Sequence, residues 1–494
     1  MVKTNLISIF RKFDPKEIKE FSEFIRSPFF NKNFNVIRLY EYIKKLYPDF
    51  NEEKLEKKYV YKRLFGKGAY NDGFMRTVIF NLGQLAEEYL KYLNFKKTPA
   101  KGDVCLLDEL SIRKIDKVFL KNYDEVKKQL DCSKYKTDEF YFFKSELDKL
   151  LEDFVYITRY KNKNLEDFTV EIFKDVVDHL THFYLIRILR HYRFLLAKQV
   201  FISVDVDFGL VELIIDYLKN KQPSYINDPV IKLHLNEILL LKESKEEYYN
   251  ELKKLLIDGQ SLLDVDQRYS LHNILHIYCN KQTYLGNRDF VKERFDLYKI
   301  ALKQGIYKGS EDRYFDGILF GNVLLTALKI GEIDWAEGFV ENYSNELSPE
   351  NREGFVNYAL SRIKFSKGEF NQSLQILNRI KSFNYIQYKI AIRDLMMLNY
   401  YELSLFSQAY SFLDSHRHFL NKNKNYFSGE RYEREANFMK FYTRALKLKE
   451  RFNTEEFKEL DKDVQKVTGI IERDWLLKKI DDFRNDPKFI SQWR

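Results

Sequence analysis

Cysteine, proline and glycine are all scarce in this chain, whose 494 residues include 3 Cys, 8 Pro and 18 Gly. The cysteines, Cys105, Cys132 and Cys279, are odd in number and far apart in the sequence, which excludes a disulfide framework and a CxxC metal motif. Proline and glycine mark turns and interrupt helices, so their scarcity favours long helices over a turn-rich β architecture. These absences predict a helical protein of a reducing compartment.

Long apolar runs are missing as well. No stretch approaches the roughly 18 consecutive apolar residues that indicate a transmembrane helix. Near the N-terminus the apolar run 6–10 is ended by Arg11 and is too short for a signal peptide. We therefore expect a cytoplasmic protein that does not insert into a membrane.

The residues that are present match a soluble globular protein, with 45% hydrophobic and 32% charged residues. Helical periodicity and breaks at proline, glycine and polar stretches predict an all-α fold in three regions. These regions are a small basic helical domain over 1–97, a middle region of long helices over 98–220, and helical hairpins with closing helices over 221–494.

Helix signals are clearest in the first region. Asp14 followed by Pro15 is typical of a helix N-terminus, because the aspartate accepts free backbone N–H groups and proline suits the first helical position. By the same capping argument Asn51 predicts a helix over 52–65.

One pattern recurs three times between residues 331 and 413. Each copy has a bulky apolar residue, a small residue three positions later, and bulky apolar residues three and four positions beyond that. Equivalent positions are 37 (333 to 370) and 36 (370 to 406) residues apart, a period at which helical hairpins stack on one another. Residues three and four positions apart lie on the same face of a helix. A small residue on that face lets a neighbouring helix pack closely against it. The copies are Ile333, Ala336, Phe339 and Val340; Phe370, Ser373, Ile376 and Leu377; Phe406, Ala409, Phe412 and Leu413.

These copies resemble the second helix of the tetratricopeptide repeat, whose pattern is Gly-x-aromatic-x-x-Ala. The first helices match less well, because the family's small residue there is replaced by Leu324 and Met397, and only Ser361 fits. The resemblance implies an α-solenoid that binds a protein or peptide on its inner surface. In that family the first helix of each repeat lines the concave side, which by position nominates Tyr358, Arg362, Asp394 and Tyr401 as partner-binding residues.

No motif in the chain indicates catalysis or a cofactor. His272, His276 and Cys279 share one helix face at i, i+4 and i+7, and all three residue types bind zinc. Asn273 stands where a zinc protease has glutamate, so we interpret this face as core packing and expect no metal site. A metalloenzyme or metal sensor at these residues is the third hypothesis. The leading one is a non-catalytic interaction scaffold.

Positive charge is concentrated at the N-terminus. Residues 1–100 hold 20 Lys and Arg against 12 Asp and Glu, a balance of +8 out of +9 for the whole chain. Within 52–65, Lys54, Lys58 and Lys62 are spaced at i, i+4 and i+8, with Lys57 beside them. Such a stripe suits phosphate groups, so the second hypothesis is a nucleic-acid-associated regulator that contacts nucleic acid through 1–97. A solvated helix face is the plainer interpretation.

Overall fold

The structure is a computed structural model, and it confirms an all-α fold. Over the residues that it describes there are 23 α-helices and no strand, apart from one isolated bridge between Phe315 and Leu347. None of these helices is both long and apolar enough to span a bilayer. The described residues are 4–66, 68–158, 165–199, 209–221, 224–309, 314–380, 385–426, 429–467 and 469–485.

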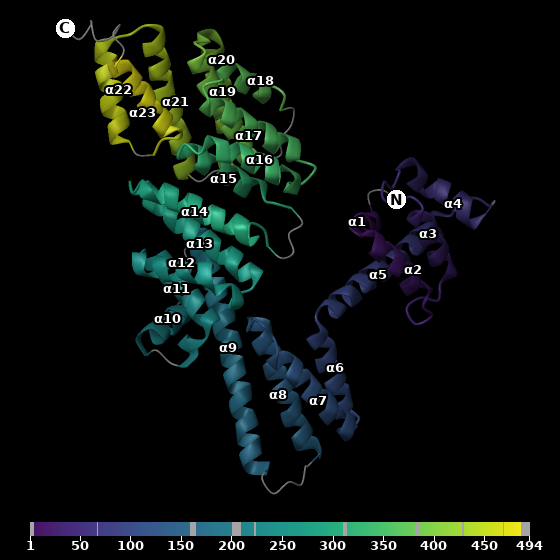
Figure 1. The fold of residues 1–494 in the computed structure, drawn as a ribbon. Helices are drawn as coiled ribbons and strands as arrows, with labels where there is room; N and C mark the ends of the chain where they lie inside the picture. Colours follow the sequence, from purple (N-terminus) through teal and green to yellow (C-terminus); the bar gives the residue numbers. More distant parts are fainter. Residues whose placement is uncertain are drawn as a thin grey trace. The chain divides into compact units, whose positions relative to one another are not determined.

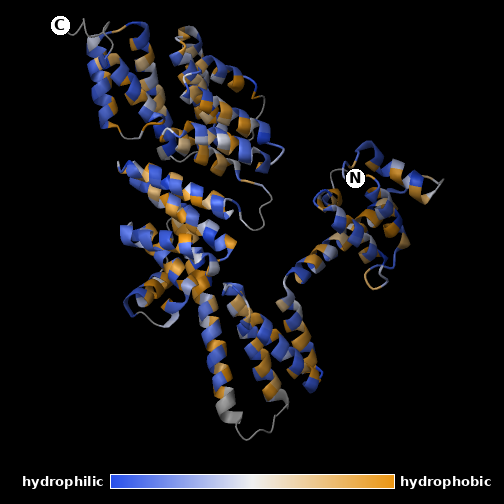
Figure 2. Cartoon of the chain, in the orientation of Figure 1, coloured by the Kyte–Doolittle hydropathy of each residue, from blue (hydrophilic) through white to orange (hydrophobic). Residues whose placement is uncertain are grey.

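The chain separates into two compact units, residues 1–133 with 139–181 and residues 134–138 with 182–494. Hydrophobic residues run as stripes along the helices of both units, with hydrophilic residues between them (Figure 2). The helices of the first unit are α1 Asn5–Phe10, α2 Pro15–Arg26, α3 Phe34–Lys44, α4 Lys57–Phe65, α5 Asp72–Lys97, α6 Pro99–Ile112, α7 Asp116–Asp131, α8 Asp138–Thr158 and the first part of α9 Leu165–Gln199 (Figure 1).

The second unit contains the rest of α9 and all later helices. These are α10 Gly209–Lys221, α11 Pro229–Glu243, α12 Glu246–Asp258, α13 Val265–Tyr284, α14 Asp289–Gln304, α15 Gly317–Lys329, α16 Ile333–Tyr343, α17 Arg352–Ser366, α18 Phe370–Leu377, α19 Ile386–Glu402, α20 Phe406–Lys422, α21 Gly429–Glu450, α22 Thr454–Lys466 and α23 Arg473–Asn485.

Helices α1 to α5 share an aromatic core. Phe21 is fully buried, and its ring lies 4.8 Å from that of Tyr40 and 5.6 Å from that of Phe10. Helix α2 starts as predicted, with Asp14 Oδ1 accepting the backbone N–H of Glu17 at 2.8 Å and Glu17 Oε2 accepting that of Asp14 at 2.9 Å. This reciprocal pair satisfies donors that the first helical turn leaves free.

The expected single helix over 52–65 is wrong. A 3₁₀ turn occupies Glu53–Leu55, Glu56 is extended with ψ of 131°, and α4 begins at Lys57. Leu55 and Val60 are both fully buried in the same core. In one α-helix, residues five apart point in directions that differ by about 140°, so both could not face that core. The break at Glu56 allows both side chains to reach it.

A separate core lies among α6 to α9. The rings of Phe119 and Phe154 stack there at 4.2 Å with only 7° between their planes, and both side chains are almost fully buried. Ile172 of α9 packs into the same cluster. The long helices expected over the middle region are therefore held by their own apolar contacts.

From α11 to α20 each helix packs against the next one in the sequence, and α15, α17 and α19 also contact one another in turn (Figure 1). Helices α16, α18 and α20 begin at the first bulky residue of each sequence copy. Two positions earlier the backbone is left-handed in every copy, at Gly331, Gly368 and Ser404. The small residues Ala336, Ser373 and Ala409 are fully buried. The three copies thus share one local structure.

Candidate functional site

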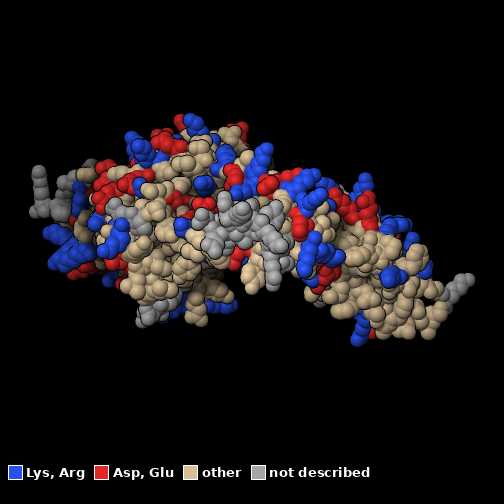
Figure 3. Space-filling model, turned by 90° about the horizontal axis from the view of Figure 1, so that it is seen from below, with Lys and Arg blue, Asp and Glu red and all other residues tan. Residues whose placement is uncertain are grey.

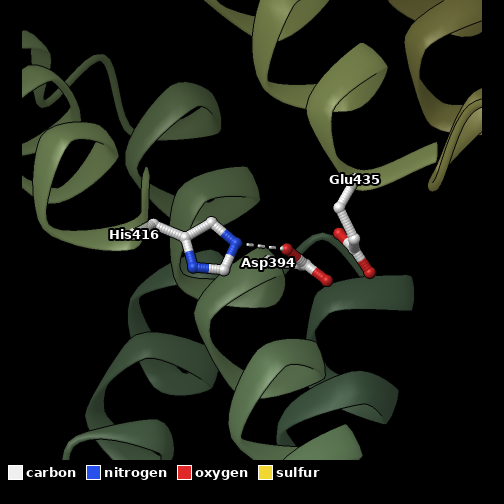
Figure 4. Close-up of side chains that lie close together, drawn as sticks. All are labelled: Asp394, His416 and Glu435. Atoms are coloured by element: carbon white, nitrogen blue, oxygen red, sulfur yellow. Dashed lines mark hydrogen bonds and ion pairs between the residues drawn. The ribbon is translucent and has the colours of Figure 1, made fainter. Parts of the chain in front are cut away.

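Three ionisable side chains meet inside the second unit, each from a different helix. Asp394 lies on α19, His416 on α20 and Glu435 on α21, and all three are at most 2% exposed. Their potential ligand atoms lie within 4.8 Å of one another, and His416 Nε2 is 3.0 Å from Asp394 Oδ1. Figure 4 shows Asp394 between the other two side chains. We call these residues the acid–histidine cluster.

Arginines surround the cluster. Arg431 donates to Glu435 Oε1 from Nη2 at 2.9 Å and from Nε at 3.1 Å. Arg362 pairs with Glu472 and donates from Nε to the Tyr358 hydroxyl at 3.0 Å. A buried charge is strongly destabilising unless it is paired, so these contacts let the interior hold several charged groups.

Burial sets the protonation of the cluster. Desolvation, with the nearby Glu472 carboxylate, raises the pKa of Asp394 to about 7 against the pull of the arginines. Desolvation and Asp394 raise the pKa of Glu435 to about 8. Burial lowers the pKa of His416 to about 4, although the Glu435 carboxylate opposes this. Near neutral pH the imidazole is therefore uncharged, and both carboxyl groups hold their protons more strongly than they would in water.

The cluster is closed to solvent, and this limits its chemistry. Two open depressions on the surface belong instead to the N-terminal helices. One is lined by residues 30–34 with Asn81, Gln84 and Leu85, and the other by Glu87, Leu90, Lys91, Asn94, Phe95 and Lys101. A sealed group of this kind has no room for a substrate, but its three side chains are of types that hold a proton or a metal ion.

The four residues nominated as partner-binding also lie in the interior. Tyr358, Arg362, Asp394 and Tyr401 are exposed by only 1%, 8%, 2% and 2%. The Tyr401 ring lies 4.9 Å from that of Trp475 on α23, and the Lys449 ammonium of α21 donates to the Tyr401 carbonyl. Together with the Glu472 carboxylate on Arg362, these contacts show that the C-terminal helices cover this face. These four residues were expected on an open concave surface, but they are buried.

The four lysines of the basic patch do not form one helical stripe. Lys54 belongs to the 3₁₀ turn, whereas Lys57, Lys58 and Lys62 lie beyond the break on α4. Lys54, Lys58 and Lys62 are exposed, and Lys57 Nζ lies 3.8 Å from Asp72 Oδ1. Figure 3 shows positive and negative side chains interspersed over much of the face that it presents. The nucleic-acid role of these lysines remains a prediction.

His272 and His276 face each other in the core, as their spacing predicted. Their Nε2 atoms are 2.8 Å apart, and the Tyr298 ring stacks on His276 at 4.0 Å. Desolvation lowers the pKa of His272 to about 4 and that of His276 well below its ordinary value. Cys279 contacts the Tyr249 hydroxyl, with Sγ 3.6 Å from the oxygen, rather than joining the two imidazoles.

Sequence reasoning missed the acid–histidine cluster as a site. Asp394 was nominated for a different role, and His416 and Glu435 were not nominated at all. The three positions are 22 (394 to 416) and 19 (416 to 435) residues apart and follow no ligand motif. What the three residues share is a position on successive helices, α19, α20 and α21, and this can be recognised only when it is known which helix faces pack together.

Comparison with known proteins adds no relative. No family model matches the chain, and no match was found among curated proteins or among solved structures.

Proposed function

We propose that this protein is a non-catalytic interaction scaffold that binds a protein or peptide partner in the cytoplasm. The observation behind the proposal is a pair of exposed phenylalanines, Phe29 in the loop after α2 at 89% exposure and Phe34 at the start of α3 at 69%. Phe34 lines the depression of residues 30–34 together with Phe30, and Phe29 lies next to Phe30 in the sequence. Exposed aromatic side chains at a depression are typical of protein–protein contact sites. Stacked helical hairpins from α11 to α20, arranged as a tetratricopeptide-like solenoid, would form the rest of the scaffold.

The loop that carries Phe29 is held in shape by its own hydrogen bonds. Asn31 Nδ2 donates to the Ile25 carbonyl at 2.9 Å and to the Asn33 carbonyl at 3.2 Å. Asn33 Oδ1 accepts the backbone N–H of Asn35 at 3.0 Å and so caps α3. The Phe30 ring stacks on buried Phe24 at 4.1 Å. A loop ordered in advance loses little entropy on binding, which favours affinity.

The charge of this region indicates the chemistry of the partner. Lys32 lines the same depression as Phe30 and Phe34, and residues 1–100 carry +8. Opposite charge steers association and fixes orientation. We therefore propose that the partner presents an apolar side chain to the phenylalanines, flanked by acidic residues.

The test is affinity capture from the native host with the full chain and two matched variants. The double variant Phe29→Ser, Phe34→Ser should no longer capture the partner. The control Tyr156→Ser, at a residue of α8 that is 85% exposed, should capture it as the unchanged chain does. Circular dichroism should show equal helix content in all three proteins. Equal capture by all of them would refute this surface.

A nucleic-acid-associated regulator is the second proposal, favoured by the charge asymmetry alone. Each lysine that neutralises a phosphate releases a counterion, so with about four lysines engaged the log–log salt slope on duplex DNA should be roughly −3 to −4. Lys58→Glu with Lys62→Glu should flatten that slope. Tight binding at about 150 mM salt that this double variant abolishes would place the nucleic-acid proposal first.

A further inference from the structure

We propose that Asp394, His416 and Glu435 form a binding site for one divalent first-row transition-metal ion, with zinc as the best match, that ties α19, α20 and α21 together. The proposal rests on the convergence of three ligand types from three helices, with all donor atoms within 4.8 Å (Figure 4). It does not depend on the interaction function proposed above.

The donor set favours a transition metal over calcium or magnesium. Calcium takes about six to eight oxygen ligands, and magnesium keeps several waters. Here one imidazole nitrogen and two carboxyl groups converge in a space closed to solvent. Mixed imidazole and carboxylate ligands suit zinc, which is commonly four-coordinate. A second carboxylate oxygen or one water molecule would complete the coordination.

The distances require only small side-chain movements. Zinc–nitrogen and zinc–oxygen bonds of about 2.0–2.2 Å at a tetrahedral angle separate two donor atoms by roughly 3.3–3.5 Å. His416 Nε2 and Asp394 Oδ1 are 3.0 Å apart and would move slightly apart. A carboxylate oxygen of Glu435 already lies within 4.8 Å of the other two donor atoms and would come closer by rotation of the side chain.

An unpartnered oxygen is the second, independent observation. Glu435 is only 1% exposed, and its Oε2 has no hydrogen-bond partner, whereas Oε1 is held by Arg431. Figure 4 shows the Glu435 carboxyl group turned towards Asp394. A buried acceptor without a partner is costly, so a ligand is expected at this atom. A metal ion bound between Oε2, Asp394 and His416 would supply it.

The surrounding charges are compatible with the ion. Two ionised carboxylates carry a charge of −2 and a neutral imidazole adds none, so together they neutralise one divalent cation. Arg362 pairs with the Glu472 carboxylate and Arg431 with Glu435 Oε1, and Glu435 Oε2 has no hydrogen-bond partner. Binding would release the protons that the buried carboxyl groups hold. Because the site is sealed, the ion would be structural.

The experiment uses the full chain, first treated with a chelator and then titrated with Zn²⁺, with Co²⁺ as a spectroscopic probe. We expect one zinc per chain by elemental analysis, a higher thermal unfolding midpoint with zinc than without, and visible d–d absorption when cobalt binds. Each titration should also release protons into a weakly buffered solution.

Two variants make the test specific. Glu435→Gln keeps the size of the side chain and mimics the protonated acid, and it should weaken zinc binding at least tenfold while the protein still folds. His272→Gln, at the other buried histidine pair, should bind zinc as the unchanged chain does. The proposal is overturned if no zinc binds at micromolar concentration, or if Glu435→Gln binds it equally well. If Glu435→Gln fails to fold, Asp394→Asn replaces it under the same criterion.

Discussion

The core of helices α1 to α5 and the core around α17 to α23 are built on different principles. Among the described residues up to 97, the buried side chains are apolar or aromatic apart from Ser22. The C-terminal core instead buries Arg362, Asp394, His416 and Glu435. An apolar core is stabilised by buried contact area, so exchanging one apolar side chain for another of similar volume usually costs little. A core with buried charges depends on each partner being present.

The largest effect should come from the aromatic core. Phe21→Ala removes a fully buried ring that contacts Phe10, Tyr40 and Tyr89, and should destabilise the N-terminal helices by about 3–5 kcal/mol. Phe29→Ala, at the exposed loop, should cost less than about 0.5 kcal/mol. Hydrogen exchange of α2 and α3 measures both. Similar losses of protection would mean that the core is assigned incorrectly.

The next effect tests the dependence on partners. Glu472→Leu leaves the Arg362 charge buried without its carboxylate and should cost about 3 kcal/mol. Adding Arg362→Met should restore most of that stability, because the pair is then replaced by apolar groups. Asp474→Ala breaks an exposed pair with Lys329 and should cost less than about 1 kcal/mol. Hydrogen-exchange protection of α17, followed across a denaturant titration, measures the stability of all three variants. A double variant no more stable than Glu472→Leu would contradict this explanation.

Acid should affect the N-terminal residues 1–97 and the second unit differently. The first 97 residues contain no histidine, whereas the second unit buries His272 with a pKa of about 4, below its ordinary value of 6.5. The folded state therefore binds fewer protons than the unfolded state, so its stability is complete above pH 6.5 and is lost as the pH falls towards 4. Exchange protection of α13 should fall over this range, and His276→Leu should make the fall shallower. An unchanged slope in that variant would assign the acid sensitivity to other groups.

The smallest effect concerns the repeat copies. Ser404 adopts a left-handed backbone with φ of 54°, where the other two copies have glycine. A side chain in that conformation costs about 1 kcal/mol, so Ser404→Gly should be neutral or stabilise by up to about 1 kcal/mol. Gly331→Ala should destabilise by about as much. The thermal unfolding midpoint should stay or rise in Ser404→Gly and fall in Gly331→Ala. A shift of both midpoints in the same direction would show that the copies are not equivalent at this turn.

Local signals were enough to predict the helical elements. The Asp14 cap, the spacing of Ala336 and Ser373, and the scarcity of proline and glycine depend on residues a few positions apart, so they can be read directly. The same reasoning failed over 52–65, because the burial of both Leu55 and Val60 in one core decides where the helix breaks. Short-range propensity is weak compared with such packing.

The sequence by itself determined the all-α class, the helix-start signal at Asp14 and the repeated pattern of α16, α18 and α20, because backbone propensity and side-chain spacing act within one or two turns. Only the tertiary structure decided that Tyr358 and Tyr401 are covered by the C-terminal helices, and that Asp394, His416 and Glu435 meet. Those outcomes depend on which helices pack together and in what register, and the free energy of that packing comes from residues far apart in the chain.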